Sequence, residues 1–117
     1  LEALHAWVLR EVAALPPGRR KLVTNHDTFG YFARRYGFEV SGSVLPSVST
    51  EAADPSAAAF AELVRRVRAE RVPAVFCEAS HNPRLAARLA EAAGDRLGPP
   101  LYTDSLGPPG SPGATYE

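Results

Sequence analysis

Residues that can bind a metal or transfer a proton follow three apolar segments of the chain. His26 comes directly after the run KLVTN, Glu78 after PAVFC, and Asp104 after PLYT. If these segments are parallel strands of one open sheet, their carboxyl ends lie along one edge, where such sheets bind ligands. One imidazole and two carboxylates suit a divalent ion such as zinc. The spacing therefore predicts a metal site at this edge.

His26 stands between an apolar run and an aromatic, helix-like segment that begins near Thr28. The N-terminus of a helix disfavours a positive charge close to it. This favours the neutral imidazole, which is the form that binds metals. An alternative fits the spacing equally well: His26 and Asp104 would only satisfy backbone groups of their own loops.

The elements that would position these residues alternate along the chain. Apolar residues at spacings of three and four predict an amphipathic helix over residues 1–15. Further helices are predicted at 28–36, after Asp54-Pro55-Ser56, and from Asn82 to Ala93, with strands at 21–25, 38–45, 72–77 and 99–104. The expected fold is α/β: a three-layer open sheet of about four mainly parallel strands with flanking helices.

Local signals predict where these helices begin and end. Asp27 is expected to cap the aromatic helix, and Gly37 to end it in a left-handed conformation. Asp54 is the expected N-cap of the next helix, with Pro55 at its first position. Gly94 is the expected stop of the last predicted helix.

The composition is that of a globular domain without the charge pattern of a nucleic-acid-binding protein. The 117 residues are 45% hydrophobic and 22% charged, and 13 basic residues balance 13 acidic ones, for a formal net charge of +0. Because phosphate binding needs a clustered excess of Lys and Arg, no nucleic-acid partner is expected. No apolar run approaches the roughly 20 residues that span a bilayer.

The single cysteine, Cys77, excludes an intrachain disulfide and a zinc site of several cysteines. Its apolar surroundings favour a buried structural thiol, and nothing indicates that it faces His81 as a nucleophile pair. His5, next to Leu4, is expected to be a packing or surface residue. The motifs GxGxxG, GxxxxGK[ST], GxSxG and HExxH are absent.

Several segments, taken in order, resemble one known family. They are VTNHDTFGYFARRYGFEVSG, then DPS before a helix, then PAVFCE, and then LYTDSLG followed by a tyrosine. Together they resemble the C-terminal lobe of the cluster A-I solute-binding proteins (the TroA/ZnuA-like group), the metal-binding receptors of zinc and manganese ABC transporters. The resemblance covers residues 21–117.

The resemblance implies a fold, a ligand set and a cargo. In that family a metal lies in a cleft between two α/β lobes joined by a long helix, and each lobe supplies two ligands. His26 would be the third ligand and Asp104 the fourth, with Glu78 orienting the site without binding the ion. Zinc is the implied cargo, because imidazole suits zinc better than manganese; manganese is the alternative.

The resemblance also implies a division of the chain and a set of partners. Residues 1–20 would be a helix leading into the lobe, and residues 21–117 the C-terminal metal-binding lobe, truncated before its last helix. An exposed apolar surface is expected where that helix packs. The partners would be the N-terminal lobe of the same protein and an ABC permease. The location would be extracytoplasmic (periplasmic or lipid-anchored), and no reaction would be catalysed.

Two other functions are considered. A small α/β enzyme would use Glu78 or Asp104 as acid or base with a metal or phosphate substrate, but it would need a nucleophile or a phosphate-binding glycine loop. Neither is found. A module that serves only for association would leave the strand-end residues unexplained.

Overall fold

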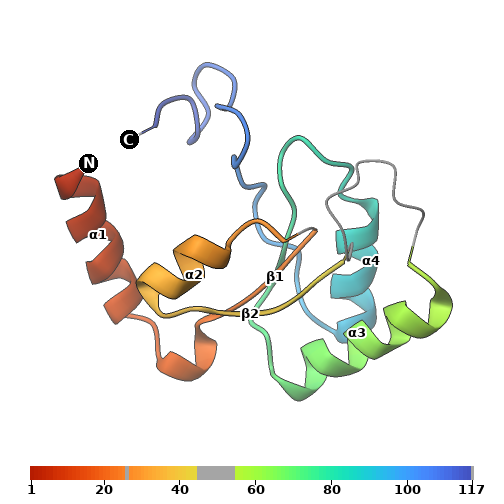
Figure 1. The fold of residues 1–117 in the computed structure, drawn as a ribbon. Helices are drawn as coiled ribbons and strands as arrows, with labels where there is room; N and C mark the ends of the chain where they lie inside the picture. The colour runs from red at the N-terminus through yellow and green to blue at the C-terminus, as the bar shows by residue number, and fades with distance from the viewer. Residues whose placement is uncertain (26, 45–54, 117) are drawn as a thin grey trace.

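The computed structural model describes residues 1–25, 27–44 and 55–116. Helices and strands alternate along the chain, as the sequence predicts, and the α/β class is confirmed. In chain order (Figure 1) the elements are α1 Glu2–Ala13, the short 3-10 helix η1 Pro17–Arg19, β1 Lys21–Thr24, α2 Gly30–Tyr36, β2 Glu39–Ser43, α3 Ala57–Ala69, β3 Val75–Phe76 and α4 Arg84–Ala93. Within the described ranges, no helix is both long and apolar enough to cross a bilayer.

The three strands form a parallel sheet in the order β2-β1-β3. β1 pairs with β2 from Lys21 opposite Glu39, and the register shifts after Leu22. β3 lies on the other side of β1, with Val23 opposite Val75. Because parallel strands point their carboxyl ends the same way, the segments that follow β1 and β3 leave the sheet at one edge.

Among the described residues the sheet has three strands, and the segment 99–104 does not form the continuous strand predicted there. This part of the chain makes only isolated parallel bridges beside β3, through Leu97 and Leu101. Pro99 and Pro100 stand between the two bridges. Proline has no N–H to donate to a strand ladder, so the pairing is interrupted there.

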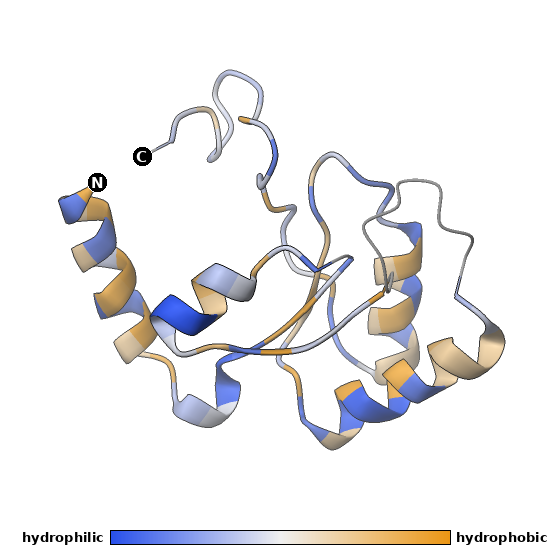
Figure 2. Ribbon diagram, in the orientation of Figure 1, coloured by the Kyte–Doolittle hydropathy of each residue, from blue (hydrophilic) through white to orange (hydrophobic). Residues whose placement is uncertain are grey.

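Helices α3 and α4 cover one face of the sheet and enclose the hydrophobic core (Figure 1). Val23, Val67, Val75 and Leu89, from β1, α3, β3 and α4, are each 0% exposed. Apolar residues of α4 face the strands, and its charged residues lie on the outer side (Figure 2). Full burial of such side chains contributes about 1.5–3 kcal/mol each, which makes this face the main source of stability.

Glycines end two of the helices, as predicted. Gly37 follows α2 with φ 74°, and Gly94 follows α4 with φ 76°. Both angles lie in the left-handed region, which glycine adopts without the steric penalty that a Cβ atom brings. The turn at Gly37 returns the chain toward β2, so it helps to place that strand beside β1.

The N-terminal ends of α2 and α3 differ from the predictions. α2 begins at Gly30, two residues later than predicted, so its N-cap is Phe29, without a side-chain cap bond, and not Asp27. α3 has Ser56 as its N-cap, whose side chain accepts a backbone N–H bond of 3.2 Å. Pro55 therefore precedes the helix instead of beginning it, and Asp54 lies outside the described residues.

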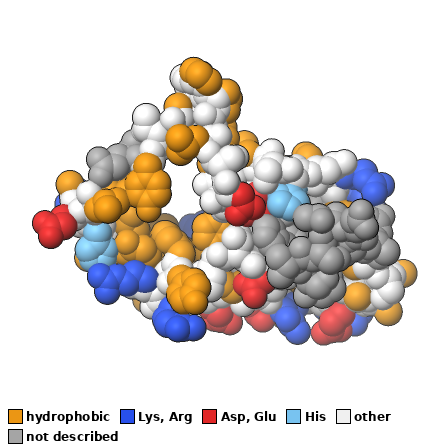
Figure 3. Space-filling view, turned by 45° about the horizontal axis from the view of Figure 1, so that its top comes forward, with side chains coloured by type: hydrophobic (Ala, Val, Ile, Leu, Met, Phe, Trp, Pro, Cys, Tyr) orange, Lys and Arg blue, Asp and Glu red, His pale blue; other side chains and the backbone are white. Residues whose placement is uncertain are grey.

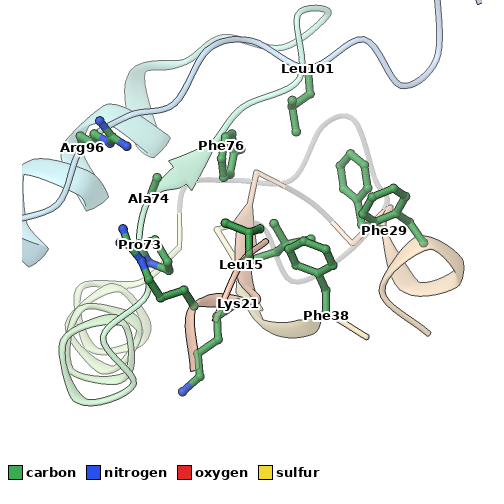
Figure 4. Close-up of a pocket in the computed structure, with 12 residues that line it drawn as sticks. Leu15, Lys21, Phe29, Phe38, Pro73, Ala74, Phe76, Arg96 and Leu101 are labelled. Atoms are coloured by element: carbon green, nitrogen blue, oxygen red, sulfur yellow. The ribbon is translucent and has the colours of Figure 1, made fainter. Parts of the chain in front are cut away.

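The face of the sheet opposite α3 and α4 is only partly covered. α2 packs against β2 there, and α1 contacts α2 (Figure 1). An apolar groove of about 470 Å³ remains open between them and the strands (Figure 4), lined by Leu22, Phe29, Phe32, Phe38, Phe76 and Leu101 together with six further residues. Hydrophobic side chains also gather around the hollow between the N-terminal helix and the C-terminal tail (Figure 3). The groove is an exposed apolar surface on this face of the sheet.

Candidate metal site

Glu78 lies at the edge of the sheet where β1 and β3 end. It is 1% exposed and follows β3 by two residues. A parallel bridge joins it to Leu101. On either side of that bridge, the Ala79 N–H donates to the Leu101 carbonyl at 2.8 Å and the Leu101 N–H donates to the Cys77 carbonyl at 3.0 Å. The segment that leads to Asp104 is therefore fastened beside Glu78.

A second connection joins Glu78 to the end of β1. Its backbone N–H donates to the side-chain Oδ1 of Asn25 at 2.9 Å. Asn25 directly follows β1 and is 5% exposed. The bond links positions 53 residues apart in the sequence. It places the residue before His26 against the backbone of Glu78.

The carboxylate of Glu78 has partners from two further segments. Its Oε1 accepts a hydrogen bond from the hydroxyl of Thr103. Its Oε2 lies 3.7 Å from Nδ1 of His81, and that nitrogen is 3.1 Å from the Ser80 hydroxyl. A buried carboxylate is stable only with such compensating partners. Glu78 is thus suited to holding neighbouring segments in place.

Asp104 lies in the bend formed by residues 103–105 and is exposed to solvent. It is one residue from the side chain that bonds to Glu78. An accessible carboxylate with a fixed neighbour is chemically suited to binding a hard or borderline divalent ion. The bridge at Leu101 and the bond from Thr103 therefore bring the segment of Asp104 to the same edge as Glu78.

His26 lies outside the described residues, so its role stays a prediction. Within the ranges 1–25, 27–44 and 55–116, no group of three or more His, Cys, Asp or Glu side chains is placed to hold a metal ion. The described part of the predicted set is Glu78 and Asp104, one buried and one exposed.

Sequence reasoning missed Asn25 and Thr103. Both stand directly before a predicted ligand, His26 or Asp104, and polar residues at strand ends commonly bond to nearby backbone. Their positions directly before two predicted ligands were the signal in the sequence that could have identified them. Their shared partner, Glu78, is distant in the sequence and emerges only from the fold.

Cys77 is a buried thiol, as predicted. It is 4% exposed, and its Sγ lies 3.4 Å from the Glu78 carbonyl and 3.9 Å from the His81 carbonyl. Burial, and next the charge of Glu78, raise the pKa of the Cys77 thiol above its ordinary value. A thiol that keeps its proton is a poor nucleophile and a poor ligand, and its contact with His81 is to the backbone, not the imidazole.

His5 is a packing residue between two helices, as predicted. Its Nδ1 lies 3.0 Å from the hydroxyl of Tyr36, and its Nε2 lies 3.1 Å from Nη2 of Arg35. The His5 and Tyr36 ring centroids are 5.6 Å apart. These contacts attach α1 to α2 on the side of the sheet that bears the groove.

Comparisons with known proteins agree on one family. The family described as zinc-uptake complex component A, periplasmic (ZnuA), matches residues 1–117. The zinc-binding protein TroA of Treponema pallidum (strain Nichols) is 40% identical over 121 residues, covering 99% of this chain and 38% of that protein. The manganese-binding lipoprotein MntA of Bacillus subtilis (strain 168) is 35% identical over 122 residues, covering 100% of this chain and 39% of that protein.

A solved structure shows the same relationship in three dimensions. The periplasmic zinc-binding protein TroA of Treponema pallidum superimposes with a TM-score of 0.83 at 38% identity, covering 98% of this chain and 42% of that one. The chain thus spans 38–39% of the length of the two relatives named above. From its match over residues 1–117, this chain belongs to the family described as zinc-uptake complex component A, periplasmic (ZnuA).

Proposed function

We propose that this chain is the metal-binding C-terminal lobe of an extracytoplasmic receptor that captures zinc and delivers it to an ABC permease in the membrane. The observation that supports this most directly is the junction at Glu78. One hydrogen bond reaches Asn25 and another reaches Thr103, the residues that precede His26 and Asp104. The residues directly before the two proposed ligands are thus both bonded to Glu78 at one edge of the sheet.

His26 and Asp104 are the ligands proposed for this chain. Neutral imidazole and carboxylate both bind zinc at short distances. Glu78 is proposed to orient the site, because its carboxylate is buried and bonded to Thr103. Zinc sites use four, or at least three, protein ligands. The N-terminal lobe of the same protein would supply the others.

Zinc is the proposed cargo, with manganese as the alternative. Imidazole nitrogen favours zinc, whereas a site of oxygen ligands alone favours manganese. The relatives TroA and MntA are described as zinc-binding and manganese-binding. Their descriptions as a periplasmic protein and a lipoprotein support an extracytoplasmic location for this chain as well.

Residues 1–20 are proposed to be the helix that leads into the lobe, and residues 21–117 the lobe without its last helix. The apolar groove between α2 and β3 supports this division, because an open sheet face in an α/β protein is normally covered by a helix.

An enzyme that uses Glu78 or Asp104 as acid or base is less well supported. A general base must lie within hydrogen-bond reach of its substrate. Glu78 is 1% exposed, and its carboxylate is engaged by Thr103. The family to which the chain belongs is described as a component of zinc uptake. We propose that the chain catalyses no reaction.

Calorimetric titration of the full-length protein with zinc tests the proposal. His26→Ala and Asp104→Ala should each weaken binding strongly, because each removes a ligand. Glu91→Ala, which removes an exposed carboxylate on α4, should bind as the unchanged protein does. This chain alone should bind zinc far more weakly than the full-length protein. Submicromolar binding by the isolated monomer, or binding indifferent to both ligand variants, would refute the proposed site.

A further inference from the structure

We propose that Thr103 is a positioning residue for Asp104 and acts through its hydrogen bond to the buried Glu78. This inference rests on the function proposed above. It adds that the bond from Thr103 to Glu78 holds the turn that bears Asp104. Neither Thr103 nor Asn25 is a proposed ligand. Each occupies the position before one, and each bonds to the same buried glutamate.

The bond from Thr103 to Glu78 restricts the turn that bears Asp104. Backbone bonds at Leu101 already fasten the chain beside the strand edge, at 2.8 and 3.0 Å. The hydroxyl of Thr103 adds a side-chain bond two residues later. Adjacent Cα atoms are about 3.8 Å apart, so the fixed Thr103 leaves Asp104 little freedom of position. Asp104 is the first exposed residue beyond these fastenings.

The environment makes this bond stronger than an exposed hydroxyl bond. Glu78 is 1% exposed, and the bond joins a hydroxyl to its carboxylate. Hydrogen bonds to ionised groups are roughly twice as strong as neutral ones, and a low local dielectric strengthens them further. The neighbouring His81 lies 3.7 Å from the other carboxylate oxygen and adds a polar partner on that side.

The bond from Glu78 to Asn25 keeps the glutamate itself in place. Because the donor is the backbone N–H of Glu78, the bond fixes the main chain and leaves the carboxylate for Thr103. The end of β1, Glu78 and the turn at Thr103 thus form one hydrogen-bonded unit. A site whose loops are ordered beforehand avoids the entropy cost of ordering them when the ion binds.

The test measures zinc affinity of the full-length protein by competition with a chromogenic chelator, beside the melting temperature of the metal-free protein. Thr103→Val removes the hydroxyl at nearly constant volume, and Thr103→Ser keeps it. We expect Thr103→Val to weaken zinc binding by about 10–100-fold, as removal of an outer partner of a metal ligand does, and Thr103→Ser to restore most of it. Thr115→Val makes the same change at an exposed position of the tail and should leave affinity unchanged.

Asp104→Ala separates the two claims, that Asp104 is a ligand and that Thr103 positions it. If Asp104→Ala abolishes tight binding but Thr103→Val stays within about threefold of the unchanged protein, the positioning role is refuted and the metal site stands. If Asp104→Ala leaves the zinc affinity unchanged, both the proposed metal site and the positioning role of Thr103 are refuted. A lower melting temperature for Thr103→Val with unchanged zinc affinity would reveal a purely structural bond and would also refute positioning.

Glu78→Gln keeps the test decisive if Thr103→Val does not fold. The amide has nearly the same shape and still offers an oxygen to Thr103, but the bond loses its charge assistance. We expect a zinc affinity between those of the unchanged protein and Asp104→Ala. An affinity equal to that of the unchanged protein would overturn the positioning role.

Discussion

Gly98 lies so close to the ring of Phe76 that a Cβ atom at position 98 would overlap ring atoms Cε1 and Cδ1. This contact allows the segment after α4 to run directly beside β3. The Gly98 N–H donates to the Val75 carbonyl at 2.8 Å, as a strand neighbour does. The route of the chain toward Leu101 and Asp104 therefore depends on the absence of a side chain at Gly98.

Gly98→Ala should destabilise the fold by about 1–3 kcal/mol, because the added methyl must displace an aromatic ring or the backbone. Urea unfolding followed by circular dichroism measures the change. Gly18→Ala is the matched control, since no atom lies within 4 Å of its added Cβ. Equal stability of the two variants would contradict the close packing of Gly98 on Phe76.

Leu89→Ala should be among the most destabilising substitutions in the chain. Leu89 of α4 is 0% exposed and packs in the core beneath the sheet. Truncation of such a residue leaves a cavity and costs about 2–5 kcal/mol. Leu106, which is 62% exposed, provides the control: Leu106→Ala should change the free energy of unfolding by less than about 0.5 kcal/mol.

Asn25→Ala should destabilise the protein by leaving the backbone N–H of Glu78 without its acceptor. Both residues are buried, and an unsatisfied buried donor costs about 1–3 kcal/mol. The change is measured by thermal unfolding in the absence of metal. Asn82→Ala removes a comparable bond, from the Arg84 N–H at 3.0 Å, at an exposed turn. Asn82→Ala should lower the free energy of unfolding clearly less than Asn25→Ala does. An equal loss in the two variants would mean that the burial of Asn25 has no influence on the cost.

Stability should fall at alkaline pH, partly because of Cys77. Burial, and next the charge of Glu78, raise the pKa of the Cys77 thiol above its ordinary value of 9.0. The folded protein then holds this proton to higher pH than the unfolded chain. The resulting stabilisation is fully present below the unfolded pKa and is lost as pH rises through the folded pKa. Urea midpoints measured across this range should decline less steeply for Cys77→Ala. Parallel declines would exclude a contribution from the thiol.

His5→Ala should loosen α1 without weakening the core. The contacts of His5 with Tyr36 and Arg35 join α1 to α2. Loss of about 1 kcal/mol of local stabilisation predicts roughly fivefold faster amide exchange in α1. Exchange in α4, which His5 does not contact, should stay unchanged and serves as the internal control. Unaltered exchange in α1 would show that these contacts do not hold the helix.

The spacing of apolar residues was enough to predict the helices, the three paired strands and the class of the fold. These features depend on local periodicity and on residues such as Gly37 and Gly94, whose backbone angles are set by their own chemistry. The strand at 99–104 was predicted wrongly because its apolar character was given more weight than Pro99 and Pro100. Those prolines were visible in the sequence, and they interrupt the pairing in the structure.

The sequence alone supplied the candidates: residue type and place after apolar runs pointed to His26, Glu78 and Asp104. The family resemblance then implied that His26 and Asp104 are the ligands, and these roles stay predictions. Only the tertiary structure decided which residues join the segments at the edge of the sheet. Glu78 joins Asn25, 53 residues away, to Thr103, 25 residues away. No local pattern specifies such partners. They meet because parallel crossovers bring distant strand ends together and because a buried carboxylate must find donors within reach.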